Sequence, residues 1–263
     1  MSERCVWVIV VDNAEAMAQS AAAKLAPYGV AVRGQTWSIE KTERWMDHAQ
    51  NAAQAGTRFV IVATSTENYQ RPTLRRQLSL FRLFLQTLTK STVNGIVLLT
   101  DPDQTTSVVS DLPGTPLLAD WQGNSTDHWA ARVVARLHAP KLPHWPVALG
   151  LFAHEKLGTW LQVQPVPDGT ARGCLLGVSG NQADISFQAT GLVGHLPENS
   201  TNEYQLKGLK FTSAGHDFKA WGLQNTLSPE QAYFARLDQE PDLLAISTLP
   251  DGQLSDVHLL CLR

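Results

Sequence analysis

The chain has 263 residues, of which 43% are hydrophobic and 17% are charged, and its formal net charge is −3. This composition excludes a disordered chain, because there is enough apolar surface to build a packed core. The slightly acidic balance argues against a nucleic-acid-binding protein, since phosphate backbones are bound through clustered positive charge. The length is sufficient for two ordinary domains.

The cysteines and the apolar runs predict the cellular compartment. Cys5, Cys174 and Cys261 lie far apart, are odd in number, and each sits beside apolar residues, which indicates buried thiols in a reducing environment. The first apolar run, residues 5–11, is too short for a signal peptide, and no run approaches the roughly 20 residues of a spanning helix. We therefore expect a cytoplasmic protein without a membrane partner.

Residues 1–139 alternate between strand-like and helix-like segments. Apolar and β-branched runs predict strands at 5–11, 30–32, 58–63, 96–99 and 115–119. Helix formers and apolar residues at helical spacing predict helices at 14–25, 38–56, 73–89 and 126–137. Strands joined by such helices pair in parallel through right-handed crossovers. The first domain is therefore predicted to be an α/β parallel sheet with helices on both faces.

The helix predicted at 73–89 carries a long apolar stripe. Its members, Leu74, Leu78, Phe81, Leu85 and Leu88, recur at spacings of four and three residues. A stripe of this kind is buried in the protein or covers a partner. Self-assembly through this helix is accordingly one hypothesis for the function.

Four arginines cluster in the first half of this helix and just before it: Arg71, Arg75, Arg76 and Arg82. One interpretation is a binding patch for an anion or a partner, because a helix N-terminus also attracts negative charge. The other interpretation is a solvated face opposite the leucine stripe.

The pattern changes after a proline-rich linker at 140–146. Residues 147–263 show alternation of period two, for example at 159–164, and turn signals at 167–169 and 250–252. A C-terminal hairpin is predicted to pair 243–246 with 257–262. Ser228-Pro229-Glu230-Gln231 has the form of a helix start, so one helix is predicted near 228–237. The second domain is therefore predicted to be β-rich, with an α+β composition.

Polar residues follow the predicted strands of the first domain. Asp12 follows the first strand, Ala63-Thr64-Ser65 ends the third, Thr100 follows the fourth and Asp120 follows the fifth. This arrangement resembles flavodoxin-like domains, and in particular the response-regulator receiver. That family places a phosphoaccepting Asp after strand three and a Lys after strand five. The resemblance therefore implies a pseudo-receiver that is not phosphorylated in the usual way.

Two segments, LAPYGVAV at 25–32 and FVIVATSTENY at 59–69, are separated by a predicted helix. They resemble the strand-B and strand-C signatures of the Toll/interleukin-receptor (TIR) domain. Enzymatic members of that family place a Trp and then a catalytic Glu about twelve residues after the Ser. Here the corresponding residue after Ser65 is Gln77, without a preceding Trp. An amide cannot replace that carboxylate, so the resemblance implies a TIR-like domain that does not cleave NAD.

The sequence predicts neither a cofactor nor a metal. After the first strand the chain reads Asp12-Asn13-Ala14-Glu15, which lacks the glycines of a Rossmann or P-loop nucleotide site. The histidines form neither HxxxH nor HExxH. His154, His195 and His216 could meet in space, but scattered surface histidines are the simpler interpretation.

The lack of a catalytic set at the strand ends favours a non-catalytic regulatory or adaptor protein that binds a protein or a small ligand. We expect a protein partner or a homo-oligomer, and no nucleic acid. One alternative is a hydrolase-type enzyme with its active site between the two domains. Its candidate residues would be Asp12, Ser65 and Glu67, joined by one of the three histidines named above. The other alternative is the self-assembling structural protein.

Overall fold

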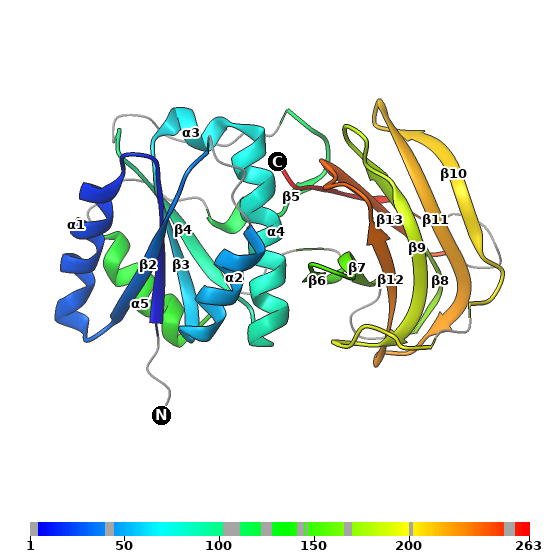
Figure 1. Ribbon diagram of the computed structural model, residues 1–263, viewed down its shortest axis with the longest axis horizontal. Helices are drawn as coiled ribbons and strands as arrows, with labels where there is room; N and C mark the ends of the chain where they lie inside the picture. Colours follow the sequence, from blue (N-terminus) through cyan, green and yellow to red (C-terminus); the bar gives the residue numbers. More distant parts are fainter. Residues whose placement is uncertain are drawn as a thin grey trace. The chain divides into compact units, whose positions relative to one another are not determined.

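The computed structural model describes residues 5–39, 45–101, 111–121, 128–140, 145, 147–165, 170–199, 202–249 and 256–263. The chain divides into two compact units, Met1–Val109 with Leu118–Pro143, and Ser110–Leu117 with His144–Arg263. In Figure 1 the labelled helices belong to the first unit and the second is built of strands. The units differ from the expected domains, 1–139 and 147–263, because residues 110–117 join the second unit. Most of the expected linker lies outside the described residues.

The first unit contains a parallel sheet of strands β1 (Cys5–Val11), β2 (Ala31–Trp37), β3 (Thr57–Thr64) and β4 (Asn94–Leu99). The strand order is β2-β1-β3-β4, and each neighbouring pair is parallel. The order therefore reverses direction between β1 and β3. In open α/β sheets, the crevice at the carboxyl ends of the strands beside such a reversal is where ligands bind.

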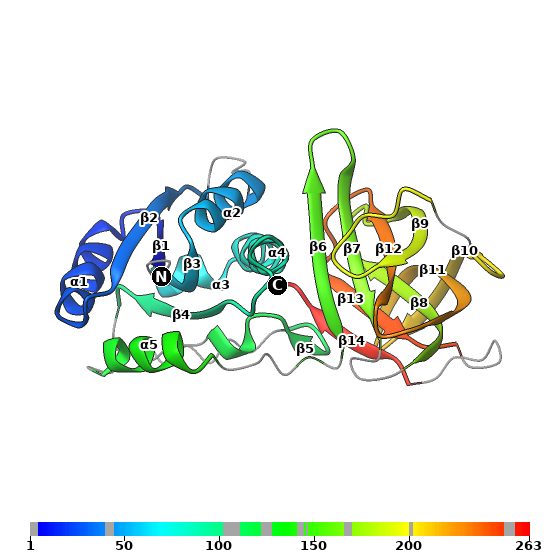
Figure 2. The same cartoon turned by 90° about the horizontal axis from the view of Figure 1, so that it is seen from below.

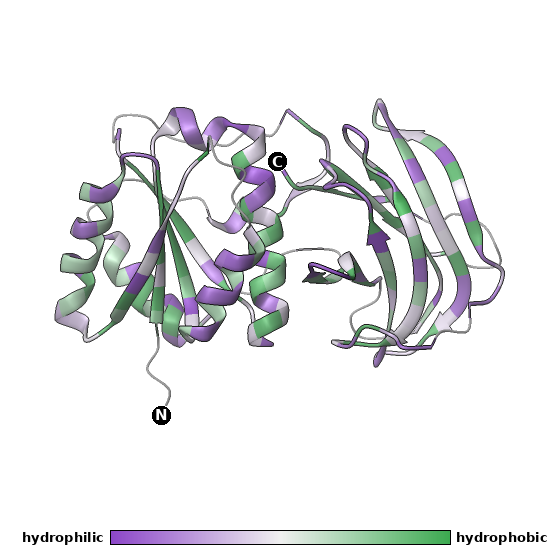
Figure 3. Cartoon of the chain, in the orientation of Figure 1, coloured by the Kyte–Doolittle hydropathy of each residue, from purple (hydrophilic) through white to green (hydrophobic). Residues whose placement is uncertain are grey.

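Helices cover both faces of this sheet. Helices α1 (Glu15–Leu25) and α5 (Trp129–His138) lie on one face, and α2 (Trp45–Gln54) and α4 (Pro72–Thr89) lie on the other (Figure 2). The core on the first face is built from Val6, Val8, Ala21, Leu25, Phe59, Ile61, Ile96, Leu98, Val133 and Leu137. Both faces of β1 and β3 are buried, so these strands are hydrophobic along their length (Figure 3).

Short helical segments complete the first unit. The 3-10 helix η1 (Ala26–Tyr28) follows α1, and α3 (Thr66–Gln70), which the sequence reading did not predict, precedes α4. The helix predicted at 38–56 is described as α2, and residues 40–44 lie outside the described part of the chain.

The apolar stripe of α4 is used inside the chain. Leu74, Leu78, Phe81 and Leu85 are fully or almost fully buried, whereas Leu88 is 41% exposed. The ring of Phe81 meets that of Trp37 edge to face, with the ring centroids 5.9 Å apart. Because these side chains already have partners in the same chain, self-assembly through the stripe would require the protein to open.

The strand predicted at 115–119 does not extend the parallel sheet. Instead, β5 (Thr115–Pro116) pairs with β14 (His258–Cys261) in the second unit, and the 3-10 helix η2 (Ala119–Trp121) packs against β4. The indole of Trp121 lies against Gly95, where an added Cβ would come within 2.5 Å of the ring. The sheet therefore ends at β4, and the buried indole covers the face of β4 at Gly95.

Two sheets form the second unit, in the orders β10-β11-β8-β13-β14-β5 and β6-β7-β12-β9. Their strands are antiparallel except for the β14–β5 pair. The strands are β6 (Ala148–His154), β7 (Gly158–Gln164), β8 (Ala171–Ser179), β9 (Ile185–Leu192), β10 (Leu206–Ser213), β11 (His216–Leu227), β12 (Gln231–Leu237), β13 (Leu243–Ser247) and β14 (His258–Cys261). The β-rich character predicted for this half is present.

The prediction of a helix near 228–237 is wrong, because strand β12 (Gln231–Leu237) occupies most of this segment. Ser228 opens a turn, in which its carbonyl accepts a hydrogen bond from the backbone N–H of Gln231 at 3.0 Å. The Gln231 side chain in turn accepts from the Ser228 N–H at 3.2 Å. The following residues then lie between β7 and β9, where pairing on both edges overrides helix propensity.

The predicted C-terminal hairpin is confirmed as a strand pair. β13 pairs antiparallel with β14, with Leu243 opposite Cys261 and Ile246 opposite His258. The predicted turn at 250–252 lies outside the described residues.

All three cysteines are buried, and none of them forms a disulfide. Within the described ranges, no helix has both the length and the apolar character needed to cross a membrane.

Candidate functional site

The strand order places the first candidate site at the ends of β1, β3 and β4. We call Asp12, Ser65 and Asp101, which follow these strands, the carboxyl edge. Parallel strands bring their carboxyl ends to one side of the sheet, and the order reverses between β1 and β3. The hydrogen bonds of these residues decide whether the edge is free to act on a ligand.

Asp12 holds the end of β1 to the segment after β2. Its carboxylate accepts a hydrogen bond from the backbone N–H of Ile39 at 3.2 Å, and its own N–H donates to the carbonyl of Trp37 at 3.4 Å. Asp12 and Asn13 have φ angles of 20° and 56°. Asp and Asn tolerate this left-handed region better than most residues, so the acidic side chain both permits and fastens the bend.

Ser65 and Asp101 together cap the short helix α3. The Ser65 hydroxyl oxygen accepts a hydrogen bond from the N–H of Asn68 at 3.2 Å. The Asp101 carboxylate accepts from the N–H of Thr66 at 3.0 and 3.3 Å. Burial acts to raise the pKa of Asp101, but the hydrogen bonds from Thr66, from its own backbone and from Thr100 together outweigh it and hold that pKa below its usual value. Both side chains are therefore occupied in holding the turn after β3.

Glu67 points away from this arrangement. Its side chain is 84% exposed and pairs with Arg71 one helical turn later, at 3.4 Å. Among the described residues, no hydrogen bond joins Asp12, Ser65 and Glu67 to one another. Gln77, which stands where the TIR resemblance expects a catalytic Glu, lies within α4. The described contacts thus do not assemble the predicted catalytic candidates into one constellation.

The four arginines proposed as a binding patch occupy different environments. Arg71 is exposed and Arg76 is half-buried. Arg75 is only 7% exposed, and its guanidinium donates to the carbonyl of Gln70 at 3.3 Å. Arg82 is completely buried. These four side chains therefore do not present one continuous cationic surface.

Arg82 forms a buried ionic contact that ties α4 to η2. Its two terminal nitrogens donate to the two carboxylate oxygens of Asp120 at 2.5 and 2.8 Å, a bidentate arrangement. Its guanidinium also lies 5.1 Å from the ring centroid of Trp121. Burial raises the pKa of Tyr69 well above its usual value, so its hydroxyl stays protonated. The charges of Asp120 and Arg82 shift this pKa in opposite directions and by less than burial does. Asp120, found where a receiver would carry a Lys, thus has a structural partner.

The histidines named as possible ligands lie on turns and strand ends of the second unit. The Nδ1 atom of His154 accepts a hydrogen bond from the N–H of Lys156 at 3.1 Å, within the β6–β7 turn. His195 follows β9, and His216 begins β11. In the part of the chain that the structure describes, no three His, Cys, Asp or Glu side chains are grouped to hold a metal ion.

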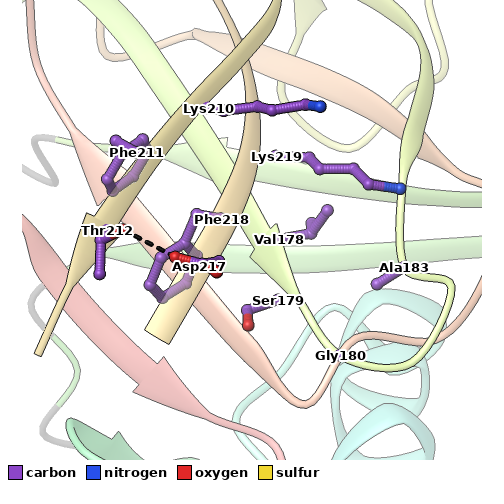
Figure 4. A pocket seen from close by; sticks show the side chains of 10 residues that line it. All are labelled: Val178, Ser179, Gly180, Ala183, Lys210, Phe211, Thr212, Asp217, Phe218 and Lys219. Carbon is purple, nitrogen blue, oxygen red and sulfur yellow. Dashed lines mark hydrogen bonds between the residues drawn. The ribbon is translucent and has the colours of Figure 1, made fainter. Parts of the chain in front are cut away.

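A second location, in the β-rich unit, was not predicted from the sequence. A pocket of about 520 Å³ opens beside the ends of β8, β10 and β11 (Figure 4). Ten residues line it: Val178, Ser179, Gly180, Ala183, Lys210, Phe211, Thr212, Asp217, Phe218 and Lys219. We call it the lysine pocket. Its volume lies within the range of small-molecule sites.

The register of one hairpin explains how the two lysines come together. Ala214 and Gly215, with φ angles of 48° and 79°, form the two-residue turn between β10 and β11, as in a type I′ hairpin. Counting outward from this turn places Lys210 directly opposite Lys219. The sequence signal was therefore the Ala-Gly turn, from which the pairing could have been counted.

No protein-family model matches the sequence, and no curated protein matches it. Among solved structures, the crystal structure of ChBD2 from Thermococcus kodakarensis KOD1 aligns with 43% of this chain and 94% of its own length, at 12% identity and a TM-score of 0.23. So low a TM-score indicates neither a shared fold nor a shared function.

Proposed function

We propose that the chain is a non-catalytic regulatory or adaptor protein, in which a flavodoxin-like unit of the receiver or TIR type supports recognition by a β-rich unit. The observation that carries this proposal is the occupied state of the carboxyl edge. Ser65 and Asp101 both accept backbone hydrogen bonds that hold the turn after β3. A nucleophile or general base needs a side chain that is free to exchange protons with a substrate.

The strand order supports the flavodoxin-like assignment of the first unit. The order β2-β1-β3-β4 coincides with the first four positions of the flavodoxin-like order, 2-1-3-4-5. Among the described residues the sheet ends at β4, and Asp120 of η2, which follows in the chain, pairs with Arg82. A receiver that lacks both the phosphoacceptor and the Lys is a scaffold rather than a phosphorylation switch.

The buried thiols bear on the cellular compartment. Cys5, Cys174 and Cys261 are buried, and none of them forms a disulfide. Thiols are kept in this state in reducing compartments, which supports our proposal of a cytoplasmic location. Its partner would be a protein or a small ligand.

Turnover assays test this proposal. The full chain is incubated with NAD⁺ and, separately, with acetyl phosphate, and products and protein mass are followed by mass spectrometry. We expect no nicotinamide release and no phosphoryl adduct above the buffer control. The proposal fails if either product forms and is abolished by Asp12→Asn or by Ser65→Asn, a replacement that can still cap α3 and adds no carboxylate.

A further inference from the structure

We propose that the lysine pocket binds the dianionic phosphate group of a small molecule, held between the ammonium groups of Lys210 and Lys219. This inference rests on the proposed binding function and names the ligand class for it. The pocket lies entirely within the second unit.

The first step is the placement of like charges. Lys210 and Lys219 are directly opposite on the antiparallel strands β10 and β11, so their side chains emerge on the same face of the sheet. Like charges in directly opposed positions destabilise a sheet. Figure 4 shows the two side chains running side by side along the pocket. An anion bound between them converts this repulsion into attraction.

The second step is the difference in partners between the two lysines. The ammonium of Lys219 lies 2.9 Å from the Asp184 carboxylate. Lys210 has no hydrogen-bond or ion-pair partner among the described residues. Any anion must compete with Asp184 for Lys219, and a dianion does so better than a monoanion because its attraction to both ammonium groups is stronger. Phosphate carries close to two charges at neutral pH, and Lys binds it as a point charge.

The third step is the set of neighbouring polar groups. Thr212 and Asp217 face each other two rungs nearer the turn, on the same face of the sheet as the lysines, and the Thr212 hydroxyl donates to the Asp217 carboxylate at 2.7 Å. This acid places negative charge at the turn end of the pocket, so the anion belongs at the lysine end. The Ser179 hydroxyl has no partner among the described residues and lines the same pocket, where it can donate to a phosphate oxygen.

The last step is size. The volume of the pocket is far larger than a phosphate ion needs, and the side chains of Val178 and Ala183 form an apolar part of its lining. The phosphate group should therefore belong to a larger molecule, in the size range of a phosphosugar or a mononucleotide.

Isothermal titration calorimetry on the full chain tests the inference, with glucose 6-phosphate, inorganic phosphate and acetate as titrants at about pH 8, where a phosphate monoester is dianionic. We expect both phosphates to bind more tightly than acetate, and to bind less tightly as salt is added. If acetate binds as tightly as the phosphates, the claim that the ligand is a dianion is wrong. If inorganic phosphate binds more tightly than glucose 6-phosphate, the claim that the ligand is larger than phosphate is wrong.

Three variants are expected to change the affinity for phosphate in different ways. Lys210→Gln should weaken phosphate binding by about fivefold or more. Lys207→Gln removes the same charge from the same strand but outside the pocket, and should change the affinity by less than about twofold. Asp184→Asn should strengthen binding, because it frees Lys219 while retaining the oxygen that accepts from Ile185.

The inference is overturned if neither phosphate binds the wild-type chain, if Lys210→Gln and Lys207→Gln lose affinity equally, or if Asp184→Asn weakens binding. Each of these results leaves the turnover assays unaffected. Conversely, turnover of NAD⁺ or acetyl phosphate would overturn the non-catalytic function without changing the phosphate titrations.

Discussion

The carboxyl edge and the lysine pocket use polar side chains in opposite ways. At the carboxyl edge, Asp12, Ser65 and Asp101 each accept hydrogen bonds from nearby backbone N–H groups. In the lysine pocket, Lys210 and Lys219 face each other, and Lys210 has no partner among the described residues. The three carboxyl-edge side chains, at the position that topology marks as the binding site, are thus hydrogen-bonded within the chain. The exposed ammonium of Lys210, on a hairpin of the other unit, has no partner in the described part of the chain.

This contrast shows that fold position alone does not locate a binding site. The crevice beside β1 and β3 is where related topologies place their ligands. Here the polar groups at that crevice stabilise turns, so removing them should cost stability. Removing Lys210 should instead cost binding, and the predictions below depend on this difference.

The largest effect is expected from Asp120→Ala. It leaves the Arg82 guanidinium buried without its bidentate partner, which should lower the free energy of unfolding by about 3–5 kcal/mol. Urea unfolding followed by circular dichroism at the helix band reports on the first unit, because the described helices lie there. Glu67→Gln breaks an exposed pair and should cost less than about 0.5 kcal/mol. Equal losses for the two variants would contradict the buried role of Arg82.

A smaller loss is expected from Ser65→Ala. Removal of the α3 cap should lower the free energy of unfolding by about 1 kcal/mol. Ser65→Asp retains an oxygen that can accept from the Asn68 N–H, and should recover most of this loss. A stable Ser65→Ala variant would show that the hydroxyl is not needed for structure, and the hydrolase alternative would gain support.

Asp101 should give the first unit part of its acid sensitivity. The pKa of Asp101 is lower in the folded chain than its ordinary value of 3.8, so its contribution to stability is present above that value. The contribution is lost as the pH falls through the folded pKa. Asp101→Asn should therefore be less stable than the wild type near neutral pH, with the difference shrinking below about pH 4. A difference that is constant across this pH range would contradict the charge-dependent contact with Thr66.

The smallest effect, and the one of opposite sign, is expected at Lys210. In phosphate-free buffer, Lys210→Gln should raise the free energy of unfolding of the second unit by a few tenths of a kcal/mol, because it removes the repulsion from Lys219. Lys207→Gln should not stabilise this unit, since Lys207 lies 5.3 Å from the Trp221 ring centroid and loses that contact. Thermal unfolding of both variants checks the sign. Destabilisation by Lys210→Gln would indicate a structural contact instead.

The α/β half of the fold was predictable because its elements are strongly periodic. The apolar runs of β1 and β3 and the stripe of α4 identify their elements from local sequence alone. The segment at 115–119 was misassigned because its partner is β14, far away in the chain, and local pattern cannot reveal such a pairing. The segment at 228–237 was misassigned because a helix-start motif can also close a turn, and the neighbours of β12 decide between the two.

The candidate site was only partly predictable. Asp12 and Ser65 were identified from their positions after strands, and they do follow strands in the structure. Both side chains accept hydrogen bonds from backbone N–H groups, and these bonds depend on turn geometry that the residue types do not specify. Lys210 and Lys219 carry no motif, and their significance appears only once the two-residue turn fixes the register of β10 and β11.

The most direct test of the contrast is a nuclear magnetic resonance titration of the full chain with glucose 6-phosphate, in which backbone amide shifts are followed residue by residue. The account predicts saturable shifts at 178–180, 183 and 210–219, and none at 12–13, 64–66 or 100–101. Shifts concentrated at the second set, with the lysine pocket unchanged, would contradict it and would return the binding site to the carboxyl edge.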